Sequence, residues 1–371
     1  MKKICLVIHS LGIGGMERVM ALLANYFADV KKAEVHLVLI GIKRNIEYPV
    51  SDKIQVHRPP FPFKNSRRTL DTLRTMRFLR KKVKNIDPDT ILSFGEYWNN
   101  LVLLSLYGLK YPVYISDRSK PDKNLGRLQN RLRDLLYPKA AGLIAQTSKA
   151  KEICLNNKWN QNVEVIGNPI RNIGPGDEEQ KENIVLSVGR LIKTKHFDDL
   201  IRMFVELNVS DWKLIIVGGD AKKQKLSEEL KSIVRELNAE DMVFLEGEQK
   251  EIDPWYHRAK LFAFTSSSEG YPNVVGEALS AGLPVVAYDC IAGPSDMIDD
   301  GENGYLVPLF ERKVFMEKLQ ELMNDEEKRE KLSKNAILKI KINNGKETAE
   351  RFFSFITGEP VTEKSTYTAV G

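Results

Sequence analysis

The residues best suited to chemistry lie in the segment SSSEGYPNVVGEALSAGLPVVA, residues 266–287. A predicted strand ends before this segment, Pro272 stands at the start of a helical run, and Gly282 with Pro284 ends that helix. The backbone N–H groups of Gly270 to Val274 would therefore lie at a helix N-terminus on the carboxyl edge of a parallel sheet. α/β proteins bind phosphate groups at such an edge, so the segment predicts an anion site.

Two carboxylates flank this predicted anion site: Glu269 precedes the helix, and Glu277 lies about one turn inside it. A carboxylate beside a phosphate is unfavourable unless it accepts hydroxyl protons, so the pair predicts a ligand that carries a phosphate and sugar or ribose hydroxyls. In the alternative interpretation, Glu269 only complements the helix dipole and Glu277 is a surface residue.

The elements that would position this site alternate between short apolar strands and longer helical patterns. Several strands are continuous apolar runs, as expected of parallel strands covered on both faces. Two βαβ series in succession predict an α/β protein with two doubly wound domains, and the Gly/Pro-rich acidic stretch 173–183 predicts a linker between them. The predicted strands are 4–8, 35–40, 90–94, 112–116, 142–146 and 163–167, then 183–189, 213–218, 242–247, 260–265 and 284–288.

Composition excludes several classes of protein. The chain of 371 residues is 42% hydrophobic and 29% charged, as in ordinary globular proteins. Cys5, Cys154 and Cys290 lie far apart, without the spacing of a zinc site or a disulfide framework, which fits a reducing cytoplasm. No apolar run reaches the roughly 18 residues of a membrane-spanning helix. We therefore expect a cytoplasmic protein that is soluble or peripheral to a membrane.

Charge divides the chain unevenly. Residues 1–170 hold 29 Lys/Arg and 14 Asp/Glu (29 − 14 = +15), so the remainder must carry −9 to give the net charge of +6. Two basic amphipathic segments, 63–85 and 125–137, predict contact with an anionic acceptor or membrane surface. They could equally be crossover helices with solvated basic faces, and no nucleic-acid-binding motif accompanies them. The candidate cations are Arg67, Arg74, Arg77, Arg80, Lys81, Arg127 and Arg131.

Two further motifs point away from cofactors and metals. The turn LGIGGMERV (11–19) nearly fits a dinucleotide fingerprint, but Glu17 occupies its third glycine position and the next strand ends without an acidic residue. A nicotinamide or flavin site is therefore not expected, and the turn could be purely structural. Asp87-Pro88-Asp89 resembles a metal-binding DxD string, yet it precedes a strand, so we interpret it as a helix end.

Taken together, these motifs resemble the family 4 retaining glycosyltransferases over most of the chain. Glu269 and Glu277 match the family's E-x7-E signature, and VGRLIKTKHFDDLI (188–201) resembles the segment in which an Arg and a Lys clamp the donor diphosphate. The resemblance assigns that clamp to Arg190 and Lys195, and gives Gly14 and Gly15 a close approach to the diphosphate. His196 stands where many members have Gly, and Asp296 replaces a usual Glu.

The resemblance implies a GT-B fold, in which two Rossmann-like doubly wound domains face each other across a cleft. Residues 1–168 would bind the acceptor and 169–346 the nucleotide-sugar donor. The helix 347–357 would cross back to the first domain, and 358–371 would form a polar tail. It also implies retaining transfer of a hexose or N-acetylhexosamine from a UDP-sugar, with uracil or guanine left open as the base.

The acceptor implied is a polyprenyl-diphosphate-linked saccharide at the inner face of the bacterial cytoplasmic membrane, in O-antigen, capsule or lipid-linked oligosaccharide assembly. No metal or cofactor would be needed. Many members place a His where this chain has Arg118, which could contact the sugar, the donor phosphate or an acceptor phosphate. Two rival functions stay open, a sugar-nucleotide epimerase and a noncatalytic nucleotide-sugar-binding protein.

Individual roles follow from the same resemblance. Glu277 would hold the ribose hydroxyls, and Glu269 would hold the sugar hydroxyls. Arg190 and Lys195 would stabilise the departing diphosphate, and Glu269, Arg190, Lys195 and Arg118 are the candidate catalytic residues. The donor-binding set from the helix start is Gly270, Tyr271, Pro272, Asn273 and Val274.

Overall fold

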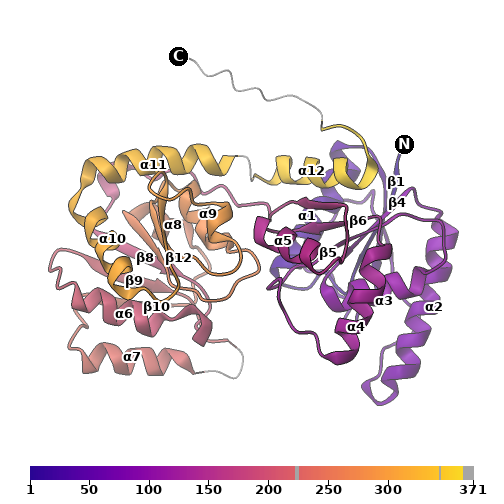
Figure 1. Cartoon of the computed structure of the whole chain (residues 1–371), viewed down its shortest axis with the longest axis horizontal. Helices are drawn as coiled ribbons and strands as arrows, with labels where there is room; N and C mark the ends of the chain where they lie inside the picture. Colours follow the sequence, from indigo (N-terminus) through magenta and orange to yellow (C-terminus); the bar gives the residue numbers. More distant parts are fainter. Residues whose placement is uncertain (222–224, 342–343, 362–371) are drawn as a thin grey trace. The chain divides into compact units, whose positions relative to one another are not determined.

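The computed structural model describes residues 1–221, 225–341 and 344–361 (Figure 1). The chain forms two compact units, one of Met1–Pro169 with the segment from Gly345 onward, and one of Ile170–Asn344. We call these unit 1 and unit 2. Of the predicted polar tail 358–371, residues 362–371 lie outside the described part of the chain.

Unit 1 is built on a seven-stranded parallel sheet with the order β3-β2-β1-β4-β5-β6-β7. The order reverses between β1 and β4, and open α/β sheets bind ligands beyond the carboxyl ends of the strands at such a point. The strands are β1 Lys3–Ile8, β2 Glu34–Leu39, β3 Gln55–His57, β4 Thr90–Phe94, β5 Val113–Ser116, β6 Gly142–Ala145 and β7 Val163–Val165. The α-helices are α1 Gly15–Asn25, α2 Arg68–Ile86, α3 Glu96–Leu106, α4 Arg127–Leu136, α5 Ser148–Asn156 and α12 Gly345–Thr357.

Both faces of this sheet are buried. Alternate side chains of β1 point to opposite faces, as strand geometry requires. Leu6 joins a cluster that contains residues of α1 and α12, whereas Val7 joins a cluster with residues of α2 and α3. The last helix, α12, contributes four buried apolar side chains at helical spacing, so it completes the core of unit 1; these are Ala349, Phe352, Phe353 and Ile356.

Unit 2 repeats the architecture with a six-stranded parallel sheet in the order β10-β9-β8-β11-β12-β13. The order reverses between β8 and β11. The strands are β8 Ile184–Val188, β9 Lys213–Val217, β10 Val243–Gly247, β11 Leu261–Phe264, β12 Val285–Tyr288 and β13 Gly304–Val307. The α-helices are α6 Phe197–Glu206, α7 Leu226–Glu236, α8 Asp253–Arg258, α9 Asn273–Ser280, α10 Arg312–Asn324 and α11 Glu326–Ile340.

The predicted α/β fold with two doubly wound parallel sheets is confirmed, with local differences. The short strands β3 and β13 were not predicted. Pro272 is the residue that caps α9 rather than its first helical residue. Asp87 ends α2 in the left-handed conformation (φ 50°), as its interpretation as a helix end requires.

Helical spacing in the basic amphipathic segment 63–85 predicts one apolar stripe, and this prediction is partly wrong; the stripe would consist of Leu70, Leu73, Met76, Leu79 and Val83. The helix buries Leu79 and Val83, but Leu70 and Leu73 are 51% and 57% exposed. The buried face instead extends to Asp71, whose carboxylate accepts hydrogen bonds from the Lys64 N–H and from Arg74. Apolar side chains on α2 therefore point outward among its cations.

Candidate active site

The predicted anion site of unit 2 lies where β8 and β11, neighbours in the sheet, both end. The turn Lys193–Lys195 follows β8, and the loop that leads to α9 follows β11. Two hydrogen bonds join these segments: the Ser267 N–H donates to the Thr194 carbonyl (2.9 Å), and the Thr265 side-chain hydroxyl donates to the Lys195 carbonyl (2.8 Å). Residues about 70 positions apart in sequence are thereby held together.

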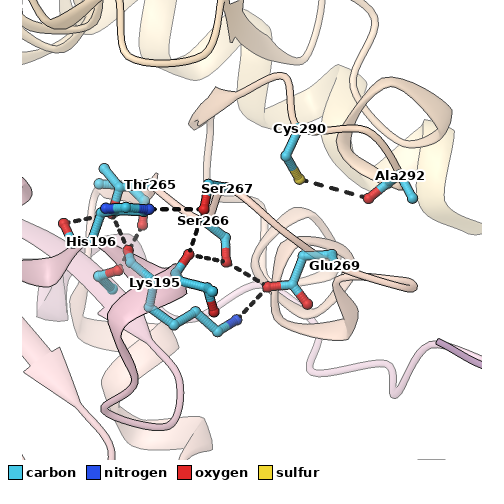
Figure 2. A network of polar contacts seen from close by, with 11 residues as sticks. Lys195, His196, Thr265, Ser266, Ser267, Glu269, Cys290 and Ala292 are labelled. Carbon is cyan, nitrogen blue, oxygen red and sulfur yellow. Dashed lines mark hydrogen bonds and ion pairs between the residues drawn. The ribbon is translucent and has the colours of Figure 1, made fainter. Parts of the chain in front are cut away.

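Lys195 and Glu269 form the centre of this site. Lys195 Nζ lies 2.6 Å from Glu269 Oε1, and Ser266 Oγ donates to the same oxygen at 2.6 Å (Figure 2). The two charged side chains are only 14% and 16% exposed, so water screens the pair weakly. The Lys195 ammonium group is therefore fixed near the start of α9, where it could bind a phosphate group.

His196 occupies the position next to this lysine and adopts the left-handed conformation (φ 50°, ψ 42°). This backbone geometry favours Gly, because a Cβ is strained in the left-handed region. The imidazole compensates with two contacts: Nε2 lies 2.8 Å from Ser267 Oγ, and the ring packs edge-on against Phe310. His196 thus links the lysine turn to the loop before α9 (Figure 2).

Glu277 is held by a different set of partners. Its carboxylate accepts a hydrogen bond from the Tyr256 hydroxyl (3.2 Å) and lies 3.7 Å from Arg171 Nε. Burial raises the pKa of Tyr256 well above its usual range, and the neighbouring carboxylate adds to the effect. Sequence reasoning missed both partners, because Tyr256 lies in α8 and Arg171 lies two positions after Pro169, both far from Glu277 in the sequence.

The start of α9 depends on a close backbone contact. Pro272 occupies the N-cap position of α9, but no side chain there accepts a hydrogen bond from the first turn of the helix. The Asn273 N–H donates instead to the Tyr271 carbonyl. Gly293 (φ 112°) lies so near that a Cβ on it would be 2.0 Å from Pro272 Cδ. Gly270, Tyr271 and Val274 belong to the same loop and first turn, so the structure brings the predicted donor-binding segment together with Lys195.

Arg190 lies two residues after the end of β8 and is exposed. Its guanidinium makes no ion pair with any residue in the described part of the chain. It is therefore a cation near the end of β8 that a ligand could recruit without breaking an existing salt bridge.

In unit 1 the predicted Gly-Gly turn follows β1. Gly14 precedes α1, and both its N–H and its carbonyl are within hydrogen-bond distance of the Tyr48 hydroxyl (3.2 and 3.0 Å). A Cβ on Gly15 would meet nothing within 4 Å. Behind the turn, Glu17 Oε1 lies 3.2 Å from His9 Nε2. Burial alone would raise the pKa of Glu17, but the hydrogen bond with His9 lowers it.

Arg118 is positioned by a polar cluster after β5. Glu96 Oε1 accepts hydrogen bonds from the Arg118 N–H (3.1 Å) and from the Ser119 N–H and hydroxyl (2.8 and 2.5 Å). The Arg118 guanidinium stacks over Phe94 and donates to the Asn168 side chain. The sequence offered no sign that Glu96 anchors this loop.

Asp117, next to Arg118, belongs to the same cluster. Its carboxylate accepts hydrogen bonds from the Tyr137 hydroxyl (2.7 Å) and Asn99 Nδ2 (2.9 Å). Burial, with the nearby Glu96 carboxylate, raises the pKa of Asp117 to about 7.

The basic helices of unit 1 contain cations of two kinds. Arg80 donates to the carbonyls of Ser105 and Tyr107, and Arg74 pairs with Asp71, so these two serve the fold. The other five are exposed, and none makes an ion pair within the described ranges 1–221, 225–341 and 344–361; they are Arg67, Arg77, Lys81, Arg127 and Arg131.

Among the described residues, no helix has the length and apolarity to cross a membrane, and no three His, Cys, Asp or Glu side chains gather as a metal site would need.

Two doubly wound parallel sheets, with a lysine–glutamate pair at the carboxyl edge of the second, are the arrangement expected of a glycosyltransferase of the GT-B class. Comparison with known proteins agrees. Residues 13–171 match the model of "Glycosyltransferase Family 4", and residues 171–339 match that of "Glycosyl transferases group 1". The chain belongs to glycosyltransferase family 4.

Two relatives are bacterial glycosyltransferases. The chain is 32% identical over 360 residues to the N-acetylgalactosamine-N,N'-diacetylbacillosaminyl-diphospho-undecaprenol 4-alpha-N-acetylgalactosaminyltransferase of Campylobacter jejuni, covering 92% of this chain and 95% of that protein. It is 29% identical to the amylovoran biosynthesis glycosyltransferase AmsD of Erwinia amylovora, over 78% of this chain and 81% of that one.

Solved structures share the fold. The lipopolysaccharide outer core galactosyltransferase WaaB superposes with a TM-score of 0.78 at 20% identity, over 96% of this chain and 99% of that one. Anabaena HepE, solved in complex with UDP, gives a TM-score of 0.79 at 17% identity, over 97% of this chain and 100% of that one. At these identities the likeness establishes the fold alone.

Proposed function

We propose that this protein transfers a hexose or N-acetylhexosamine from a UDP-sugar to a polyprenyl-diphosphate-linked saccharide in bacterial surface-glycan assembly, with retention of configuration and without a metal. The observation that carries the proposal is Lys195, fixed by Glu269 where β8 and β11 end beside the start of α9. The Campylobacter relative acts on a diphospho-undecaprenol-linked saccharide, and HepE was solved with UDP, which support the acceptor and the donor.

In this proposal the cations of unit 2 replace a metal. As the bond between sugar and diphosphate breaks, negative charge grows on the phosphate oxygens, and preorganised cations stabilise it most effectively in a site shielded from water. Lys195 is already ordered, whereas exposed Arg190 would be recruited by the donor.

The carboxylates have separate tasks in the same scheme. Glu269 accepts hydroxyl protons from the sugar, and Glu277 those of the ribose. Because Glu269 is already paired with Lys195 and bonded to Ser266, it is a poor nucleophile. We therefore favour attack by the acceptor on the face that the diphosphate leaves, with the departing phosphate taking the acceptor's proton.

Unit 1 would receive the acceptor. Its carboxyl edge carries Gly14, Gly15 and Arg118, and its outer helices carry exposed leucines among the cations. Leu70 and Leu73 of α2 and Leu128 and Leu135 of α4 are each more than half exposed. Exposed apolar side chains among cations suit the surface of an anionic bilayer, where each cation contributes about 1 kcal/mol. We place the protein peripherally on the inner face of the cytoplasmic membrane.

A transfer assay tests the catalytic proposal. Purified protein is incubated with a panel of UDP- and GDP-sugars and prenyl-diphosphate-linked N-acetylhexosamine acceptors, and products are read by mass spectrometry. Lys195→Ala and Glu269→Ala should each lower turnover at least 100-fold without unfolding the protein. Lys193→Ala is the matched control, because Lys193 is exposed in the same turn. Turnover retained in both site variants would refute the assignment, and conversion of the donor without an acceptor would indicate an epimerase.

A flotation assay tests the membrane proposal separately. Arg77→Glu/Lys81→Glu should abolish binding to vesicles that contain anionic lipid. The control Lys313→Glu/Lys331→Glu makes the same change in net charge on exposed residues of unit 2 and should bind like the wild type. Equal flotation of both variants, or binding that does not weaken with added salt, would refute the membrane surface.

A further inference from the structure

Unit 1 contains a cavity of about 480 Å³ between α2, α3 and α4, which Figure 1 shows as neighbouring helices. Its volume falls within the roughly 300–1,000 Å³ of small-molecule sites. Nine of its fourteen lining residues are aliphatic, aromatic or methionine, and Arg68 is the one charged residue among the lining residues that the structure describes. The cavity therefore suits an apolar ligand with an anionic end.

The cavity lies at the carboxyl edge of the unit 1 sheet. Ile40 and Ile42, which line it, follow the end of β2, and Trp98 and Leu101 lie in the first half of α3, which begins just after β4. Trp98 also stacks on His9 at the end of β1, with ring centroids 5.5 Å apart and planes within 4°. One wall of the cavity therefore adjoins the turn that leads to Gly14.

We propose that this cavity binds the first isoprene units of the acceptor's polyprenyl chain, an inference that rests on the proposed function. Phe63, Met76, Leu101 and Leu132 would surround the hydrocarbon, and burial of each CH2 group favours binding. Arg68 is exposed and lines the cavity, so it can meet the diphosphate that follows the chain.

The surroundings of the cavity favour a lipid over a soluble ligand. Leu104 lines it and is 42% exposed. The outward leucines of α2 and α4 and four of the five unpaired cations are on the helices that form its walls, and Arg67 immediately precedes α2. Exposed apolar side chains and cations therefore lie on the same helices as the cavity, as a prenyl diphosphate that enters from an anionic bilayer would require.

Binding of soluble prenyl diphosphates tests this proposal on the full chain. Calorimetry with inorganic diphosphate, geranyl diphosphate and farnesyl diphosphate should show at least tenfold tighter binding at each step of added hydrocarbon. Met76→Trp, which fills the cavity, and Leu104→Glu, which places a charge in it, should each weaken farnesyl diphosphate binding at least tenfold. Leu338→Glu places the same charge on an exposed leucine of α11 in unit 2 (63% exposed, against 42% for Leu104) and should bind like the wild type. Circular dichroism and melting temperature confirm that each variant folds.

Several outcomes would overturn the proposal. The proposal is wrong if farnesyl diphosphate binds no more tightly than inorganic diphosphate. It is also wrong if both cavity variants bind farnesyl diphosphate as tightly as the wild type does. Dodecyl phosphate that binds as tightly as farnesyl diphosphate would assign the cavity to membrane lipids instead.

The proposed function can fail independently of the cavity. If the cavity variants lose farnesyl diphosphate binding but the wild type transfers no sugar to any acceptor, the cavity stands and the function falls. If transfer occurs with equal KM for chain-free and prenylated acceptors, the function stands and the cavity falls.

Discussion

The left-handed backbone of His196 allows a substitution test that separates strain from contact. A side chain in this conformation costs about 1–2 kcal/mol relative to Gly. The imidazole recovers about 1 kcal/mol from its hydrogen bond with Ser267 and about 0.5–1 kcal/mol from the edge-on contact with Phe310. His196→Ala keeps the strain and loses both contacts, so it should destabilise unit 2 by about 1.5–2 kcal/mol. His196→Gly loses the contacts but also the strain, so it should stay within about 1 kcal/mol of the wild type.

Differential scanning calorimetry measures this contrast. Unit 2 spans 175 residues (344 − 170 + 1), and for that size 1 kcal/mol shifts the melting temperature by about 2–4 °C. The Ala variant should therefore melt about 3–8 °C lower in the unit 2 transition, and the Gly variant close to the wild type. A Gly variant as unstable as the Ala variant would refute the reasoning, because it would show that the backbone at residue 196 stores no strain.

Three other predictions follow from the same structure. Gly293→Ala should lower the melting temperature and weaken UDP binding at least tenfold, because its Cβ collides with Pro272. Gly301→Ala is the control, since Gly301 also has a positive φ (76°) but a Cβ there meets nothing within 4 Å. In a double-mutant cycle on the free energy of unfolding, Lys195→Ala and Glu269→Ala should show a coupling energy of about 2 kcal/mol, between the values typical of exposed and of buried ion pairs. Additive effects of the two substitutions on the free energy of unfolding would contradict the pairing. The pKa of Asp117 is raised to about 7 in the folded protein, so ionisation of this carboxyl lowers the stability of the wild type as pH rises from about 4 to 7. The melting temperature of Asp117→Asn should therefore rise relative to that of the wild type between pH 5 and 8. A difference in melting temperature that stays constant over this range would contradict the pKa shift.

The fold was largely predictable because parallel strands covered on both faces require continuous apolar runs. The two missed strands show the limit of that signal. Gln55–His57 is a three-residue strand at the sheet edge with one apolar side chain, and Gly304–Val307 is a four-residue strand at the edge of the other sheet. Neither is long enough to show a period.

The site was predictable only in part. The loop before α9 has a local signal in its Gly, Pro and Glu residues, and this signal led to Glu269. The partners that neutralise or orient the charged groups are set by tertiary packing, so Tyr256, Arg171 and Glu96 had no local signal. The predicted apolar stripe on α2 was partly wrong because helical spacing shows which residues share a face of the helix but not which face packs on the rest of unit 1.

The position of α12 in the chain has a consequence for how the protein is made. Its aromatic side chains Phe352 and Phe353 complete the core of unit 1, although about 175 residues separate them from the rest of that unit. During synthesis, unit 2 can finish folding while unit 1 still lacks its last helix. A fragment that stops at Pro169 would expose the apolar surface that α12 covers, whereas Ile170–Asn344 is continuous and is the half suited to expression by itself.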